Sequence, residues 1–143
     1  MSEFVERLEW LMFERGFNKK MLAAQTHINA TCISHYFLGK HVPTIESLVK
    51  LADFFECSTD FLLGREEEGR KLTFKQCPPF SERIAYLKKR SGGSAQSFYQ
   101  GLGISKTCYY GWINGTRKPT LDNIIYIADK LELRVDYILG REA

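Results

Sequence analysis

The sequence lacks the features of a membrane protein and of a disulfide-rich secreted protein. Its longest apolar runs are a few residues long, far below the roughly 20 residues that cross a bilayer. Its first residues include an acid, Glu3, and lack the basic region of a signal peptide. Its four cysteines have no tight CxxC spacing, which favours reduced thiols over a disulfide scaffold. We therefore expect a cytoplasmic protein with no membrane partner.

Signatures of enzyme chemistry are also missing. No glycine-rich loop lies between a strand and a helix, where a phosphate-binding loop would be. Cys32 and His35 share a helix face, and the spacing allows a zinc site with His27 or His41. A cysteine at this position is more simply a small packing residue, and no acid or oxyanion donor has the spacing of a Cys–His catalytic site. We predict no catalytic residues, no metal and no other cofactor.

The strongest feature that is present is a repeat. Shifting the 143-residue chain by 76 positions aligns residues 4–66 with residues 80–142 without a gap. The alignment has 19 identities over 63 positions, most of them at turns, helix caps and apolar sites. We predict two copies of one small domain, at residues 1–66 and 80–143. The linker at 67–79 is expected to hold at most a brief extended segment, Leu72–Lys75.

Each copy predicts five short helices and no sheet, so the expected fold class is all-α. Apolar residues recur about every 3.6 positions, and glycines stand where helices would end. Asn29 and Ser105 are expected to cap the third helices. The expected bounds are Lys19–Thr26 and Ala95–Leu102 for the second helices, ends at Gly39 and Gly115 for the third, and Ser58–Leu63 and Arg134–Leu139 for the last.

A sequence motif surrounds the expected second and third helices. In copy 2 it is Leu102–Thr120, LGISKTCYYGWINGTRKPT, and copy 1 has a weaker version within residues 27–44. The motif resembles the helix-turn-helix of the phage-repressor family, the Cro/cI or XRE type. The resemblance covers nearly all of the chain and implies two tandem five-helix lambda-repressor-like DNA-binding domains.

The resemblance also implies roles for individual residues. The third helix of copy 2 would enter the major groove of DNA while the second crosses the backbone, with Tyr109 and Trp112 in the core. Lys106 would donate to guanine and Thr107 would contact a base, whereas Tyr110 would either face bases or cover the edge of the core. The expected DNA-binding residues of copy 2 are Gln96, Ser105, Lys106, Thr107, Tyr110, Gly111, Asn114, Thr116, Arg117 and Lys118.

Both copies depart from the family pattern in places. Tyr99 occupies a position where the family has a small residue, which copy 1 keeps as Ala23, and His27 replaces the turn glycine Gly103. Copy 1 also lacks a strong bidentate base-contacting residue, so whether it contacts DNA stays open. Its candidate DNA-binding residues are Lys19, Lys20, Ala30, Thr31, Ser34, His35 and Lys40.

The two copies differ in charge and in apolar surface. Residues 4–66 carry seven Lys and Arg against eight Asp and Glu, a net charge of −1, whereas residues 80–142 carry ten against six, a net charge of +4. Because phosphate neutralisation supplies most non-specific DNA affinity, we expect copy 2 to be the main DNA-binding unit. At four positions where copy 2 is polar, copy 1 has Met12, Phe13, Leu38 and Phe54.

These four apolar residues have two explanations. They form an interaction surface that packs against copy 2 or against a second chain in a homodimer, or they only enlarge the core of copy 1. The sequence as a whole predicts a sequence-specific transcriptional regulator of the XRE type that binds double-stranded DNA. The alternative is a protein-interaction module, antitoxin-like or an adaptor, that uses the same fold for protein contacts.

Overall fold

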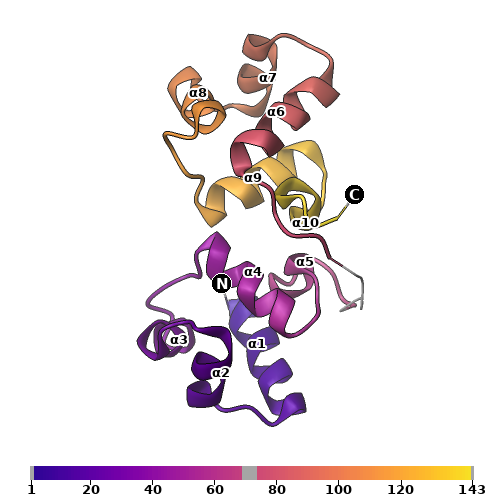
Figure 1. Ribbon diagram of the computed structural model, residues 1–143. Coiled ribbons are helices and arrows are strands. Elements are labelled where there is room, and N and C mark those ends of the chain that lie inside the picture. Colours follow the sequence, from indigo (N-terminus) through magenta and orange to yellow (C-terminus); the bar gives the residue numbers. More distant parts are fainter. Residues whose placement is uncertain (1, 69–73, 143) are drawn as a thin grey trace. The chain divides into compact units, whose positions relative to one another are not determined.

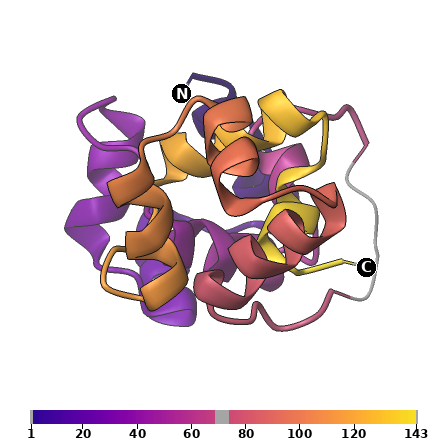
Figure 2. The same cartoon turned by 90° about the horizontal axis from the view of Figure 1, so that it is seen from above.

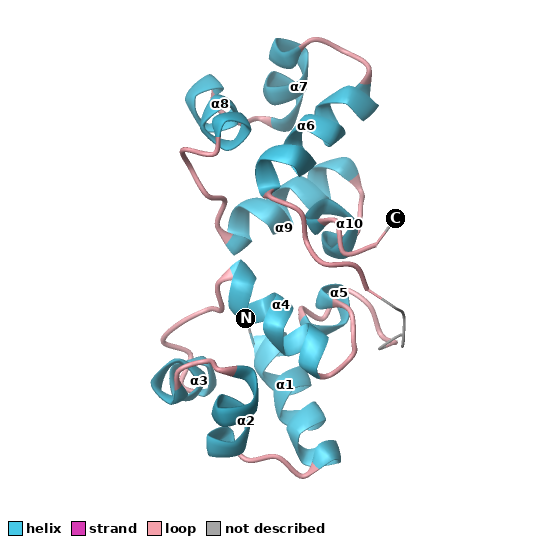
Figure 3. Ribbon diagram, viewed as in Figure 1, coloured by secondary structure: helices cyan, strands magenta, loops and turns pink. Residues whose placement is uncertain are grey.

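The computed structural model describes residues 2–68 and 74–142, and these residues form ten helices. Figure 3 shows only helices and loops in this part of the chain, so the prediction of an all-α fold is confirmed. No described helix is long and apolar enough to cross a membrane. The chain divides into two compact units, Met1–Thr73 and Phe74–Ala143, and Figures 1 and 2 show the helices of each unit from two directions.

The first unit is built around helices that bury one apolar face each. Helix α1 contacts α5, and α2 contacts both α3 and α4. Leu8, Leu22, Ile33 and Leu48 are fully buried and form the centre of this core. The helices are α1 (Ser2–Arg15), α2 (Lys19–Thr26), α3 (Ala30–Phe37), α4 (Ile45–Phe54) and α5 (Thr59–Leu62).

The second unit has helices of similar length in the same order. Helix α6 contacts α7, α8 and α10, and α7 contacts α8 and α9. Its core includes the fully buried Ile84, Ile124, Ile127 and Ile138. The helices are α6 (Phe80–Ser91), α7 (Ala95–Leu102), α8 (Lys106–Asn114), α9 (Leu121–Leu131) and α10 (Val135–Leu139).

The end of the expected linker lies against the second unit. The backbone N–H of Lys75 donates to the carbonyl of Arg141 at 2.7 Å, and the guanidinium of Arg141 lies 4.1 Å from the centre of the Phe74 ring. Of the predicted extended segment, Leu72 and Thr73 lie outside the described residues.

Helix starts and ends follow the predicted signals closely. The side chain of Asn29 accepts from the N–H of Thr31 at 2.7 Å, and Ser105 accepts from the N–H of Cys108 at 3.1 Å, so both predicted caps are confirmed. The bounds predicted for the second helices are those observed. Helix α3 ends at Phe37, two residues before the predicted Gly39.

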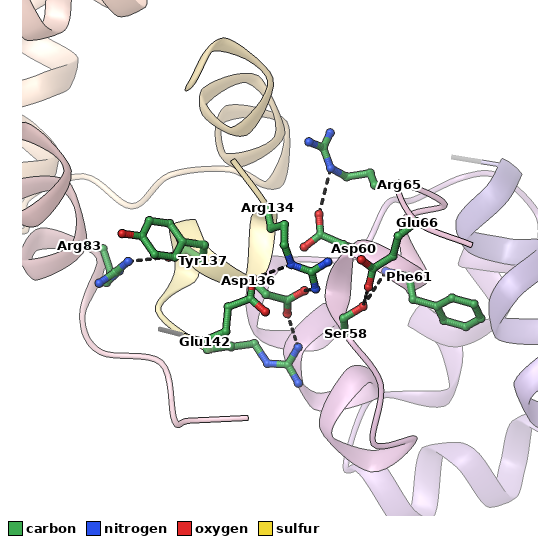
Figure 4. A network of polar contacts seen from close by, with 11 residues as sticks. Ser58, Asp60, Phe61, Arg65, Glu66, Arg83, Arg134, Asp136, Tyr137 and Glu142 are labelled. Atoms are coloured by element: carbon green, nitrogen blue, oxygen red, sulfur yellow. Dashed lines mark hydrogen bonds and ion pairs between the residues drawn. The ribbon is translucent and has the colours of Figure 1, made fainter. Parts of the chain in front are cut away.

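A network of polar contacts joins the first and last helices within the first unit. Arg7 on α1 donates to the carbonyl of Phe61 at 3.3 Å and to that of Glu66 at 3.0 Å. Arg65 donates to Asp60 at 3.1 Å, and the hydroxyl of Ser58 donates to Glu66 (Figure 4). The bonds from Arg7 satisfy backbone carbonyls at the end of α5 and just beyond it, and α5 is too short to be stable without tertiary contacts.

The second unit has the corresponding network 76 positions later. Arg83 on α6 donates to the carbonyls of Tyr137 at 2.5 Å and Ile138 at 3.2 Å. Asp136 pairs with Arg141 at 2.5 Å, and both side chains are fully buried. Figure 4 shows Arg134 near Asp136 and Glu142, with which it forms ion pairs. We call these contacts, in either unit, the closing network.

The buried pair predicts an unequal effect of two matched substitutions. Asp136→Ala should destabilise the second unit by about 3 kcal/mol, because it removes a carboxylate partner from a fully buried guanidinium. Asp60→Ala should cost the first unit less, because the side chain of Arg65 is 25% exposed and can turn to water. Native-state hydrogen exchange of core amides in the full chain measures each unit separately. Equal losses in the two units would contradict this account.

Candidate nucleic-acid interface

Helix α8 presents a polar face to solvent and an aromatic face to the core. Lys106 and Thr107 are exposed in its first turn, next to the exposed cap Ser105. Tyr109 and Trp112 are 3% and 2% exposed. The prediction that these two rings lie in the core is confirmed, and helical geometry then turns Thr107 toward the opposite face of α8.

Tyr99 packs beneath α8, at a position where we expected a small residue. The ring centre of Tyr99 lies 5.5 Å from that of Tyr109, which also contacts Phe98 at 5.8 Å. Burial, and to a lesser extent the neighbouring Tyr110, raises the pKa of Tyr109, so its phenol stays neutral at ordinary pH. Tyr110 contacts Tyr109 at 5.1 Å and is 40% exposed, so it covers the core edge and still presents part of its ring to solvent.

Gly111 does not lie on the exposed face, and the expectation that it faces base edges is wrong. It is buried on α8 because the side chain of Arg117 covers it. A Cβ atom at Gly111 would lie 2.7 Å from Cδ and 2.8 Å from Cγ of Arg117. The sequence alone could not show this contact, because it depends on how the loop after α8 folds back.

The remaining predicted contacts of the second unit are all exposed. Within the described residues, no hydrogen bond or ion pair joins the guanidinium of Arg117 or the ammonium of Lys118 to another group. Gln96 lies in the first turn of α7, near the positive end of the helix dipole. The exposed residues are Gln96 on α7, Asn114 at the end of α8, and Thr116, Arg117 and Lys118 in the loop that follows.

The corresponding surface of the first unit is less basic and partly closed by its own side chains. The rings of His35 and His41 lie 4.7 Å apart, and the ammonium of Lys19 lies 4.7 Å from the centre of the Phe37 ring. Ser34 and His35 are half-buried, whereas Lys19, Lys20, Ala30, Thr31 and Lys40 are exposed.

Cys32 was expected to pack beneath α3, and this expectation is wrong. Its side chain is exposed, because the buried face of α3 is formed instead by Ile33 and Tyr36. In the described part of the chain, no group of three or more His, Cys, Asp and Glu side chains is placed to hold a metal ion.

The four apolar residues specific to copy 1 separate into core and surface. Phe13 and Leu38 are 86% and 65% exposed. Met12 is buried, so its prediction as interaction surface is wrong: on a helix it points about 100° away from Phe13 and into the core. Phe54 is half-buried, with its ring 5.3 Å from that of Phe17.

An apolar groove lies beside Phe13, and sequence reasoning missed half of the residues that line it. The groove has a volume of about 710 Å³. Phe17 and Phe37 contribute to it but come from a loop and from the end of α3, so no helical periodicity in the sequence links them. The lining residues are Glu9, Met12, Phe13, Phe17, Asn18, Lys19, Lys20 and Phe37.

Part of the chain is similar to a known protein family. Residues 8–62 match the family described as Helix-turn-helix. The chain is 36% identical over 61 residues to the HTH-type transcriptional regulator AnsR of Bacillus subtilis (strain 168), covering 43% of this chain and 53% of AnsR. It is 36% identical over 62 residues to the cryptic phage CTXphi transcriptional repressor RstR of Vibrio cholerae, covering 43% of this chain and 55% of RstR.

A third relative is the HTH-type transcriptional activator BcrR of Enterococcus faecalis, 37% identical over 65 residues, or 46% of this chain and 32% of BcrR. The chain therefore spans between a third and about half of the lengths of these relatives. All three are named as transcriptional regulators and none as an enzyme. No solved structure matches the chain significantly.

Met12 is buried and Phe13 is exposed, so substitutions at these two neighbouring positions should differ strongly in their effect on stability. Met12→Lys should destabilise the first unit by about 3 kcal/mol or more, because it buries a charge in an apolar core. Phe13→Lys should destabilise the first unit far less, since the ring is exposed and lies outside the core of that unit. Copy 2 carries Lys88 and Lys89 at the matched positions. Chemical denaturation followed by unit-resolved NMR signals checks both, and a stable Met12→Lys protein would show that the core placement is wrong.

Proposed function

We propose that this chain, whose residues 8–62 match the Helix-turn-helix family, is a sequence-specific DNA-binding transcriptional regulator that acts in the cytoplasm. The observation that carries the proposal is the family match together with the naming of the relatives as transcriptional regulators. One of these relatives is named as a repressor and another as an activator. Similarity to these relatives is therefore compatible with repression and with activation.

We further propose that the second unit is a second helix-turn-helix domain. Several contacts of the first unit recur in it 76 positions later, which supports this proposal. Phe4 packs edge-on against Tyr36 with ring centres 5.7 Å apart, and Phe80 packs in the same way against Trp112 at 5.5 Å. The closing network recurs in the same manner, with Arg83 in place of Arg7.

In this proposal the second unit is the main DNA-binding unit. Its net charge of +4 over residues 80–142 favours attraction to phosphates. Lys106 and Thr107 would contact base edges, while Arg117, Lys118 and Gln96 would contact phosphate oxygens. The exposure of these side chains supports the assignment.

The first unit would support DNA binding or supply an interaction surface. Exposed Phe13, which lines a groove, and exposed Leu38 favour the second role, since large exposed apolar side chains are typical of protein contacts. The partner would be the second unit or a second chain, and a homodimer would allow two second units to bind about 34 Å apart on DNA, one helical turn.

The same surface favours a second candidate function, a protein-interaction module of the antitoxin or adaptor kind. In that case the groove beside Phe13 would be the main binding site and DNA contacts would be incidental. Binding to duplex DNA and its dependence on salt separate the two functions, because only phosphate contacts release counterions.

Salt-dependent binding is therefore the first test of the proposed function. The affinity of the intact protein for a mixed duplex pool should fall linearly on a log–log plot against salt, and the Arg117→Ala/Lys118→Ala variant should reduce the slope by about 1.8, or about 0.9 per phosphate contact. Selection from a random duplex library should then enrich one sequence. An intact protein with no salt-sensitive affinity for any duplex would favour the interaction module.

A separate experiment tests the interaction surface. The Phe13→Lys/Leu38→Asn variant carries the residues that copy 2 has at these positions, Lys89 and Asn114. If the surface joins two chains, the mass measured by light scattering should fall from dimer to monomer. If it joins the two units, the mass should be unchanged and the melting temperature lowered. Unchanged mass together with unchanged melting would contradict an interaction role for Phe13 and Leu38.

A further inference from the structure

Gly111 and Arg117 form a contact that joins the proposed DNA-contacting helix to the loop that follows it. The methylene groups of Arg117 lie where a side chain at Gly111 would be, with Cδ, Cγ and Cβ at 2.7, 2.8 and 3.1 Å from the position of a Cβ atom. Any residue other than glycine must therefore displace Arg117. The displaced part is a side chain and not backbone, so a substitution should move Arg117 without unfolding α8.

Backbone hydrogen bonds hold the loop in place at the same residue. The carbonyl of Gly111 accepts from the backbone N–H groups of Thr116 and Arg117, each at 3.0 Å. It also accepts from the hydroxyl of Thr116 at 3.3 Å. The loop is thus tied to α8 one turn before the helix ends, and the Cα of Arg117 has a defined position relative to Lys106 and Thr107.

The first unit makes a contact at the matched positions with different side chains. His35 and His41 stand 76 positions before Gly111 and Arg117, and their rings lie 4.7 Å apart. The carbonyl of His35 accepts from the N–H of Lys40 at 2.9 Å and from that of His41 at 3.4 Å. The fold therefore pairs these two positions in both units, and the second unit alone fills the pair with glycine and arginine.

We propose that Gly111 is a positioning residue. Because it has no side chain, the methylene stem of Arg117 can lie across α8, and the guanidinium is thereby preorganised to contact a DNA phosphate. The inference rests on the proposed DNA-binding function of the second unit. An arginine whose stem is already ordered loses less side-chain entropy on binding than a freely rotating one. Arg117 is exposed and, among the described residues, its guanidinium has no partner, so its donors are free for a phosphate.

The test is a double-mutant cycle on the intact protein, with a mixed-sequence duplex two to three helical turns long as the probe. Gly111→Ala should lower the affinity about five- to tenfold near 0.1 M salt and reduce the salt slope by about 0.9, the loss of one phosphate contact. Arg117→Ala should have the same effect, and the double variant should lose no more than either single variant. A purely structural role of Gly111 would leave the slope unchanged.

Gly101→Ala is the matched control, since a Cβ atom at this exposed glycine on α7 would meet nothing within 4 Å. It should keep the wild-type slope. A wild-type slope in Gly111→Ala, or additive losses in the double variant, would overturn the positioning role. Absence of any salt-sensitive duplex binding by the wild-type protein would instead overturn the proposed function, and the positioning role with it.

A measurement on the wild-type protein covers the case in which Gly111→Ala fails to fold. NMR relaxation of the side-chain methylene groups should show the stem of Arg117 to be more ordered than that of its neighbour Lys118 in the free protein. Equal disorder of the two side chains would overturn the proposal, because an unordered arginine is not preorganised.

Discussion

Burial of Tyr109 and Trp112 is the interaction on which the proposed interface depends. Trp112 packs edge-on against Phe80 of α6, and Tyr109 packs against Phe98 and Tyr99 of α7. These contacts fix the rotation of α8 about its own axis. Because a helix turns about 100° per residue, that rotation leaves its first polar residues facing solvent and brings Gly111 under the returning loop.

The closing networks explain how units of about 70 residues hold their ends together. Such small units bury a limited fraction of their apolar surface, and their last helices, α5 and α10, are too short to be stable alone. Arg7 and Arg83 satisfy carbonyls at the ends of those helices. The repeat identities at these arginines and at Asp60 and Asp136 thus have a structural role, which leaves the exposed faces of α3 and α8 free to differ.

The two units differ most where they face solvent. The second combines a basic loop with an exposed polar face on α8, whereas the first exposes Phe13 and Leu38 and holds the rings of His35 and His41 4.7 Å apart. The proposed regulator would combine a basic DNA-contacting unit with a second unit whose surface is more apolar, and this division accounts for both kinds of surface. The His35–His41 and Gly111–Arg117 pairs show that one backbone contact accommodates very different side chains.

The sequence by itself determined the helices, because helical periodicity, capping residues and helix-ending glycines are local signals. It also separated the buried Tyr109 and Trp112 from the exposed Lys106 and Thr107, because the two rings are apolar, Lys106 is charged, and helical spacing places Thr107 on the face opposite the rings. Tertiary structure alone decided that Gly111 and Met12 are buried and Cys32 is exposed. Those positions depend on which helix or loop covers a given face, and that packing joins residues far apart in the sequence.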